Sequence, residues 1–433
     1  MSFLSKESLL SKVSLFRINF IILALGWGGA ALYSLPERLH TYDYAGFVLT
    51  DWLINYEGGF VRRGLMGQIL YWFYQWHPYP VHYVVMALSV LSLLSFVCWV
   101  VYLYRRERWS MMSLVCTPFL GYPLFVFNGY RRDFVILLLV CFAFYAVKRY
   151  WEHRSSQWFI LANLVSVFTI LSHEASFFFM IPLLMVVSWY HCRATCSVYS
   201  SVVRVLSLFI IPILSMGACV IFKGGTDVAQ AIWSSWQPCI ERYPLNCTGI
   251  GSGVEALTWE TWRTFKFHLG LNFGGSLSEA YPTIPSWPLL LLSYVVVYYL
   301  TSRLNTVNLQ FNRMADYDNV LMSCILLLQF VFLLPMFTVL SCDVCRISGY
   351  WIFSSLFAFH FFKERKLYPE CLIRLSFLWQ QRIDKSCLLS SPWTYILIIW
   401  FIPMTFVGAP SIDSSLGGKI VAGIVTLVMS LVS

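Results

Sequence analysis

The sequence predicts an all-α fold, a polytopic membrane helical bundle of about twelve transmembrane helices. Composition is the first observation behind this prediction: 58% of the 433 residues are hydrophobic and 12% are charged, whereas soluble domains carry about 25% charged residues. The second observation is that apolar runs close to membrane-spanning length recur from residue 16 to the C-terminus. The composition excludes a soluble fold, and the lack of a visible repeat or linker in the sequence favours one integral membrane domain, 1–433.

The apolar runs define the predicted membrane spans. Several runs are shorter than the roughly 20 residues that cross a bilayer, so we expect those helices to be tilted, broken or shielded by neighbours. The first run is too long for the apolar part of a signal peptide, so we predict a helix there. The predicted spans cover residues 16–35, 80–104, 110–128, 133–147, 157–171, 175–190, 205–222, 287–302, 320–340, 349–362, 393–409 and 419–433.

Lysine and arginine residues predict the orientation of the chain. Short loops that are rich in these residues stay in the cytoplasm, and the loops at 105–108 and 148–154 are both short and basic. This orientation places both termini in the cytoplasm and leaves two long segments outside, residues 36–79 and 223–286. We therefore predict a multi-pass protein of the bacterial inner membrane. The net charge of +9 follows from this topology and does not indicate a nucleic-acid partner.

The outer segment 36–79 predicts two short helices. The first helix is amphipathic, because its apolar residues form one stripe at helical spacing, and we expect it to lie on the outer leaflet as an interfacial helix. Gly58 and Gly59 end this helix, and a second, apolar helix is predicted at about residues 65–76. The stripe consists of Ala45, Val48, Leu49, Trp52, Leu53 and Tyr56.

The large outer (periplasmic) segment 223–286 contains Cys239 and Cys247, which lie in a loop that includes a proline. In an oxidising compartment this pair can form a structural disulfide, and we predict that it does. The other cysteines are expected to pack as small apolar side chains. His191, Cys192 and Cys196 lack a fourth ligand, so the sequence predicts no metal site and no cofactor.

Five small groups of charged residues lie in or beside the apolar runs, and all five fall on the predicted outer side. Charges at membrane depth cost free energy, so their presence there indicates a functional site. Their convergence on one side predicts a single polar site that opens to the outer leaflet. The groups are Asp43, Asp51 and Glu57; Arg62 and Arg63; Arg131, Arg132 and Asp133; His173 and Glu174; and Asp343 and Arg346.

Arg62 and Arg63 follow a glycine turn and precede a predicted helix N-terminus. Backbone N–H groups at such a terminus and the planar forks of two guanidinium groups together suit a phosphate or pyrophosphate. The alternative is that both arginines hold lipid head groups or pair with Asp51 and Glu57. Arg131 and Arg132 are expected in a tight outer turn, which requires polar residues in any case.

His173 and Glu174 lie in an otherwise apolar stretch. There, desolvation can raise the pKa of the carboxyl group and make it a general base. Equally, Glu174 can stabilise the N-terminus of the next helix. Asp343 and Arg346 either pair with each other or line the same outer site. Among the carboxylates, Glu57 is the first candidate base and Glu174 the second.

Several motifs are absent from the sequence. It contains no phosphate-binding loop of the Walker A type, no glycine fingerprint of dinucleotide binding after a strand, and no HExxH zinc motif. ATP-driven transport and nicotinamide chemistry are therefore not expected. Acidic residues, paired arginines and aromatic rings at the outer leaflet instead suit a reaction on a lipid-linked sugar, whose phosphate–sugar bond supplies the energy.

This pattern resembles the bacterial O-antigen or capsular-polysaccharide polymerases and, more broadly, the C-type membrane glycosyltransferases that use polyprenyl-phosphate sugars. The resemblance rests on the dozen spans, the cytoplasmic N-terminus, the acids of the first outer segment and the large later outer segment. It implies that Asp43, Asp51 or Glu57 is the acid of the first outer loop. The chain departs from the polymerases in lacking a matched pair of basic motifs in two large outer loops.

The resemblance implies glycosyl transfer or polymerisation of lipid-linked saccharides at the outer face of the inner membrane, for surface polysaccharide assembly. Its expected partners are membrane lipids, a polyprenyl-(pyro)phosphate-linked saccharide and other polysaccharide-assembly proteins. A flippase or secondary transporter of lipid-linked or anionic solutes is the alternative, although the sequence shows no pair of related halves. A membrane acyltransferase with His173 as its base is a further option.

Overall fold

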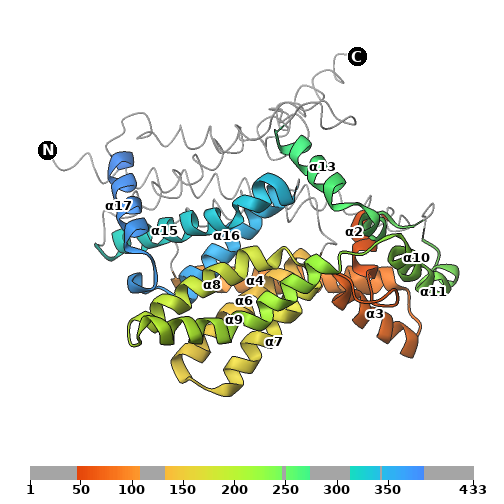
Figure 1. Cartoon of the computed structure of the whole chain (residues 1–433), viewed down its shortest axis with the longest axis horizontal. Helices are drawn as coiled ribbons and strands as arrows, with labels where there is room; N and C mark the ends of the chain where they lie inside the picture. Colours follow the sequence, from red (N-terminus) through yellow and green to blue (C-terminus); the bar gives the residue numbers. More distant parts are fainter. Residues whose placement is uncertain (1–45, 108–131, 246–249, 274–312, 342–343, 385–433) are drawn as a thin grey trace, which may run out of the picture.

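The computed structural model describes residues 46–107, 132–245, 250–273, 313–341 and 344–384. All regular elements in these ranges are helices, as Figure 1 shows. Four of the predicted site residues lie outside the described residues: Asp43, Arg131, Cys247 and Asp343. The predicted spans outside the described residues are 16–35, 110–128, 287–302, 393–409 and 419–433.

The described helices follow one another along the chain with short connections. In order they are α2 (Phe47–Thr50), the 3-10 helix η2 (Asp51–Leu53), α3 (Gly64–Trp76), α4 (Val81–Glu107), α6 (Asp133–His153), α7 (Ser156–Ser172), α8 (Ser176–Arg193), α9 (Val198–Ile221), α10 (Thr226–Ser235), α11 (Gln237–Arg242), α12 (Ser252–Glu255), η3 (Ala256–Thr258), α13 (Thr261–Phe273), α15 (Arg313–Pro335), the π-helix η5 (Met336–Leu340), α16 (Val344–Phe361), η6 (Arg365–Leu367) and α17 (Glu370–Asp384).

Five stretches of these helices are long and apolar enough to cross a membrane. They are Val81–Trp99 within α4, the whole of α6, α8 and α9, and Val320–Leu340 in α15 and η5. Helix α7 is apolar but shorter. All six coincide with spans that the sequence predicts, so the membrane character of the chain is confirmed, while the count of about twelve helices stays a prediction.

The bundle is formed by α4, α6–α9 and α15–α17, and its core is built from apolar side chains. Few polar groups lie inside, and those that do are hydrogen-bonded between helices, as lipid-embedded helices require. Gln329 of α15 donates to the carbonyl of Phe179 on α8 and to the hydroxyl of Ser354 on α16, both at 2.8 Å. The indole of Trp151 on α6 donates to Ser188 on α8 at 2.8 Å. These bonds fix the mutual positions of α6, α8, α15 and α16.

A second apolar core lies at one end of the bundle and combines the two predicted outer segments. We call this part the cap; it consists of α2, η2, α3, α10–α12 and η3, and Figure 1 shows its members side by side. The indole of Trp236 on α11's N-terminal side donates to the carbonyl of Leu53 at 2.8 Å. Helix α3 lies directly on the backbone of residues 52–54, because a Cβ at Gly67 would be 1.9 Å from the carbonyl oxygen of Ile54.

The predicted amphipathic helix at 45–56 is wrong in length. The structure has the short α2 and η2 there, and the chain becomes extended at Ile54. The apolar side chains of Leu49, Trp52 and Leu53 are buried in the cap core. Their stripe is covered by the segment 229–257 of the same chain, which the periodicity of one helix cannot reveal. The second predicted helix, at about 65–76, is confirmed as α3.

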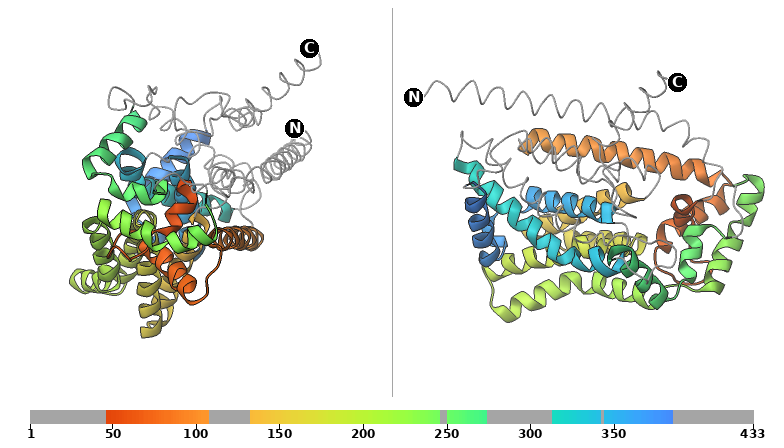
Figure 2. Two further views of the ribbon diagram at one scale, coloured as in Figure 1. Left: turned by 90° about the vertical axis from the view of Figure 1, so that its right-hand side faces the viewer. Right: turned by 90° about the horizontal axis from the view of Figure 1, so that it is seen from above.

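The two ends of the bundle collect different loops. At one end Arg154 lies 4.2 Å from the ring centroid of Trp151, which packs 5.0 Å from the ring of His191 and near η6. At the other end α6 and α8 begin and α7 and α9 end, next to the cap. Figure 2 shows the cap and α17 at opposite ends of the molecule. Loops that the sequence assigns to one side of the membrane therefore lie at one end of the bundle.

Candidate functional site

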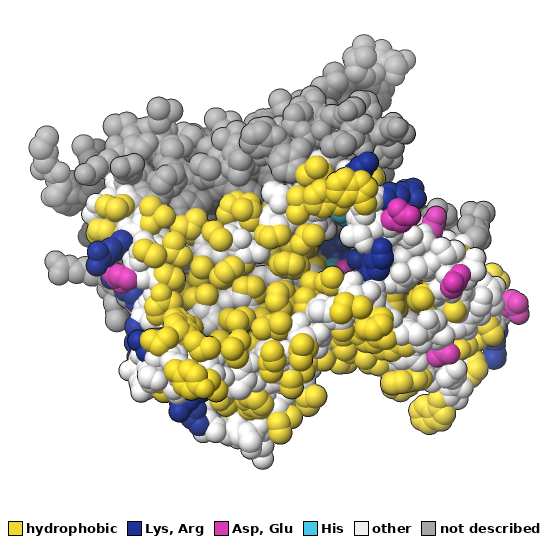
Figure 3. All heavy atoms as spheres, viewed as in Figure 1, with side chains coloured by type: hydrophobic (Ala, Val, Ile, Leu, Met, Phe, Trp, Pro, Cys, Tyr) yellow, Lys and Arg dark blue, Asp and Glu magenta, His cyan; other side chains and the backbone are white. Residues whose placement is uncertain are grey.

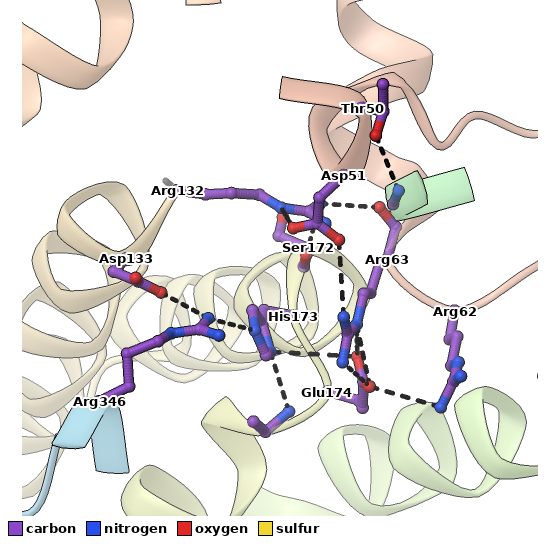
Figure 4. Close-up of polar contacts among 12 residues, drawn as sticks. Thr50, Asp51, Arg62, Arg63, Arg132, Asp133, Ser172, His173, Glu174 and Arg346 are labelled. Carbon is purple, nitrogen blue, oxygen red and sulfur yellow. Dashed lines mark hydrogen bonds and ion pairs between the residues drawn. The ribbon is translucent and has the colours of Figure 1, made fainter. Parts of the chain in front are cut away.

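A cluster of charged side chains lies where the cap meets the bundle, and Figure 4 shows its arrangement. Four of the five predicted groups contribute to it. The cap supplies three members, the loop ends of the bundle four, and helix α16 two. We call this set the charged cluster; it consists of Asp51, Arg62, Arg63, Arg132, Asp133, His173, Glu174, Arg346 and Tyr350.

Arg63 grips Glu174 with both edges of its guanidinium group. Its Nε lies 2.8 Å from Oε2 and its Nη2 lies 2.7 Å from Oε1, a bidentate arrangement that is among the strongest side-chain contacts. Its Nη1 also lies 3.5 Å from Oδ1 of Asp51. Arg63 adopts a left-handed backbone conformation with φ of 65°, which costs roughly 1–2 kcal/mol for a residue with a Cβ. Such strain occurs where the surroundings fix the residue firmly.

Arg132 joins the cap to the bundle. Only 1% of its side chain is exposed, and its Nε and Nη2 lie 3.0 and 2.6 Å from Oδ2 of Asp51. Its Nη1 donates to the backbone carbonyls of Arg63 and Ser172, both at 3.0 Å. The buried charge is thus matched by a carboxylate and by two carbonyl oxygens, which offsets the cost of removing it from water.

Arg346 connects α16 to the start of α6 and to the turn between α7 and α8. Its Nη2 lies 2.8 Å from Oδ1 of Asp133, 3.1 Å from Nε2 of His173 and 3.2 Å from the hydroxyl of Tyr350. The Tyr350 hydroxyl also donates to Asp133. Arginine nitrogens only donate, so Arg346 bonds to His173 in the tautomer whose Nε2 is unprotonated.

The carboxyl groups of the cluster are ionised, contrary to the prediction for Glu174. Burial alone would raise the pKa of Glu174, but the guanidinium group of Arg63 outweighs it and holds this pKa well below its ordinary value. Burial is likewise outweighed at Asp51, where Arg132 and Arg63 lower the pKa of the carboxyl group. A raised pKa was expected because the sequence does not reveal the arginine across the site.

His173 is neutral. Burial lowers its pKa to about 3, and the positive charge of Arg63 acts in the same direction. Its Nδ1 lies 3.3 Å from the backbone N–H of Ala175 and 4.0 Å from Oε2 of Glu174. An imidazole with so low a pKa binds protons weakly, which disfavours the reading of His173 as the base of an acyltransferase.

Glu57 lies away from the cluster. Its side chain is exposed and its Oε1 accepts a hydrogen bond from Gln68 at 3.3 Å. Among the described residues no ion pair joins Glu57 to Arg62 or Arg63. The structure therefore does not bring the first candidate base to the arginines, whereas it does bring Asp51 and Glu174.

Arg62 is the most open arginine of the cap's share of the cluster. Its Nη1 lies 3.7 Å from Oε1 of Glu174, with 27% of the side chain exposed. Its Nε is buried and has no hydrogen-bond partner among the described residues, while its backbone N–H donates to Phe222 at 3.0 Å. Figure 3 shows basic side chains in a recess between the apolar face of the bundle and the more polar cap.

Three helices begin at the cluster. Arg63, Arg132 and Ala175 are the residues that precede α3, α6 and α8, respectively. Helix N-termini carry a positive partial charge, which favours anions. Within the cluster four arginines face three carboxylates, so one positive charge remains in excess. Both contributions favour a bound anion.

Tyr350 is the cluster member that the sequence did not single out. It lies in an aromatic stretch, Tyr350–Phe353, that reads as part of a membrane span. Its ring stacks on Phe179 with 4.4 Å between centroids, while its hydroxyl reaches Arg346 and Asp133. The usable signal was its position four residues after Arg346, which places both side chains on one face of a helix.

Other predicted sites receive less support from the described residues. Cys239 is a buried free thiol that lies 3.7 Å from the carbonyl oxygen of Tyr79. Since Cys247 lies outside the described residues, the disulfide stays a prediction. Among the described residues, no group of three or more His, Cys, Asp and Glu side chains is placed to hold a metal ion.

Comparison with known proteins gives no match to a family model, to a curated protein or to a solved structure.

Proposed function

We propose that this chain is a membrane glycosyltransferase that transfers or polymerises lipid-linked saccharides at the outer face of the bacterial inner membrane, for surface polysaccharide assembly. In this proposal the charged cluster binds the phosphate or pyrophosphate of the polyprenyl-linked donor. One observation carries the proposal: a buried cluster with an excess of positive charge lies at the N-termini of three helices, at the end of an apolar bundle.

The position of the cluster favours an anion that is attached to a lipid. A phosphate at the end of the spanning helices can enter the recess while its polyprenyl chain stays in the hydrocarbon region. Charge interactions are stronger there than in water, because the effective dielectric constant is lower. Arg62 and Arg63 supply planar donors that match phosphate oxygens.

The proposed reaction breaks the bond between the anomeric carbon and the phosphate oxygen, and the phosphate leaves with the electron pair. A new bond joins the anomeric carbon to the acceptor oxygen, whose proton passes to a carboxylate. Among the described residues, Asp51 and Glu174 are the carboxylates close to the arginines. Asp51 is fixed by Arg132, so Glu174 is the better placed proton acceptor.

The proposal is tested with the purified full-length protein in lipid nanodiscs, supplied with defined polyprenyl-pyrophosphate-linked saccharides. We expect a new glycosidic product by mass spectrometry. The Arg62→Lys variant keeps the charge but loses the planar fork, and we expect its turnover to fall about tenfold or more. The matched control is Arg149→Lys at the opposite end of the bundle, which should keep the wild-type rate.

A wild-type protein that forms no product contradicts the transferase. If the same protein in sealed vesicles moves a labelled lipid-linked saccharide across the bilayer, the flippase takes its place.

A further inference from the structure

We propose that Glu174 occupies the phosphate position of the cluster in the free protein, and that a phosphate-bearing ligand binds by displacing its carboxylate from Arg63 and Arg62. This inference rests on the proposed function for the identity of the ligand. Glu174 is then an internal competitor of the ligand, and its release is part of binding.

The contacts of one carboxylate oxygen support this inference. Oε1 of Glu174 lies 2.7 and 3.0 Å from two nitrogens of Arg63 and 3.7 Å from Nη1 of Arg62. Two guanidinium groups thus surround a single anionic oxygen from two sides, as they would surround an oxygen of a phosphate. Figure 4 shows both arginines directed at Glu174 from the same side. A phosphate offers more acceptor oxygens than a carboxylate and can also engage the unpartnered Nε of Arg62.

The cluster divides into a fixed part and an exchangeable part. Arg132 is 1% exposed and is held by Asp51 and by two carbonyl oxygens that belong to different segments, so it cannot turn to a ligand without opening the junction of cap and bundle. In contrast, the side chains of Arg62 and Glu174 are 27% and 15% exposed, and their mutual contact is long. The exchangeable part therefore consists of Arg62, Arg63 and Glu174.

Displacement also changes the chemistry of Glu174. The guanidinium group of Arg63 is what holds the pKa of this carboxyl group low against the effect of burial. Once a phosphate takes over the contact with Arg63, burial dominates and the pKa rises. The released carboxylate then accepts a proton more readily, beside the phosphate that it has yielded to. Ligand binding would in this way produce the base only when the donor is present.

The decisive experiment measures binding of inorganic pyrophosphate to the purified full-length protein in nanodiscs of uncharged lipid. Glu174→Gln removes the competing charge and keeps the shape. When a group occupies a site more than nine-tenths of the time, its removal strengthens apparent binding by about tenfold or more. We therefore expect Glu174→Gln to bind pyrophosphate at least about tenfold more tightly than wild type. The double variant Glu174→Gln with Arg62→Gln should lose most of this gain.

The matched control is Glu370→Gln, which removes an exposed carboxylate that also contacts two arginines, Arg365 and Arg374, but far from the cluster. It should bind as wild type does. Binding of Glu174→Gln that is equal to or weaker than that of wild type overturns the inference, as does a gain that persists in the double variant.

Glu174→Gln leaves Arg63 without its partner and can lower the yield of folded protein. Glu174→Asp keeps the charge but is too short for the bidentate contact, so its affinity for pyrophosphate should lie between those of wild type and Glu174→Gln. A value at or below the wild-type affinity counts against displacement.

A short-chain polyprenyl pyrophosphate is compared in the same assay. Tighter binding of the lipid form supports a lipid-linked ligand, whereas equal binding of both forms supports the anion site and contradicts the lipid source. The assay contains no acceptor and no transfer step, so tighter binding by Glu174→Gln without product formation by wild type would retain the displacement and reject the transferase.

Discussion

Arg132 of the bundle and Asp51 of the cap form a buried ion pair, with 2.6 Å between Nη2 and Oδ2. The two residues are far apart in the sequence, and their pair is the point at which the cap is fastened to the N-terminal end of α6. Both also contact Arg63, through its guanidinium group and its carbonyl oxygen. The pair therefore sets the backbone position of the arginine that holds Glu174.

The first prediction concerns this pair. Asp51→Asn leaves the buried guanidinium of Arg132 without its counter-charge, and breaking a buried pair in this way costs about 3–5 kcal/mol. We expect the free energy of unfolding to fall by about that amount, with the cap released to proteolysis first. Thermal unfolding and limited proteolysis of the purified protein measure both effects. Glu370→Gln, at an exposed pair, serves as the control and should change little. Equal stability of the two variants would refute the fastening role.

The second prediction concerns acid. His173 has a pKa of about 3 in the folded protein, below its ordinary value near 6.5, so the unfolded chain binds its proton first as the pH falls. Stability is therefore fully present above about pH 6.5 and declines between there and pH 3. The lowered pKa of Glu174 adds a further loss below its ordinary value, near pH 4.5. Unfolding temperatures between pH 7 and pH 4 test this.

His173→Asn should remove the decline that begins near pH 6.5 and keep the one at lower pH. If this variant shows the wild-type profile, another group causes the acid sensitivity.

The third prediction concerns the contact of α3 with the extended strip at 52–54. In Gly67→Ala the new Cβ would lie 1.9 Å from the carbonyl oxygen of Ile54, a backbone atom that cannot move without shifting the cap. We expect a loss of folded protein in the membrane and faster cleavage of the cap. Gly217→Ala in α9 meets nothing within 4 Å and is the control. Normal abundance and protease resistance of Gly67→Ala would contradict this packing.

The fourth prediction concerns orientation. Ser252→Cys places a thiol on an exposed position of the cap and should react with an impermeant thiol reagent added to spheroplasts. Native Cys371 on α17 is also exposed but lies at the opposite end, so it should react only after the membrane is opened. Peptide mass spectrometry distinguishes the two sites. Labelling of Cys371 in sealed spheroplasts would reverse the proposed topology and remove the outer-face site.

The sequence by itself determined the membrane-spanning helices and the identity of most charged residues in the cluster. Spans are local, because about 20 consecutive apolar residues suffice to define one. Charged residues beside such runs are conspicuous because burying them costs free energy. The groups containing Arg63, Arg132, Glu174 and Arg346 were therefore found without a structure.

Only the tertiary structure decided which carboxylate meets which arginine. Glu57 and Asp51 lie six positions apart in one segment, yet Glu57 is exposed at Gln68 while Asp51 is buried at Arg132. The direction of the pKa shift of Glu174 likewise depends on Arg63, which lies 111 positions away in the chain. Hydropathy and helical periodicity report only a residue's neighbours in sequence, whereas the energy of a charge depends on neighbours in space.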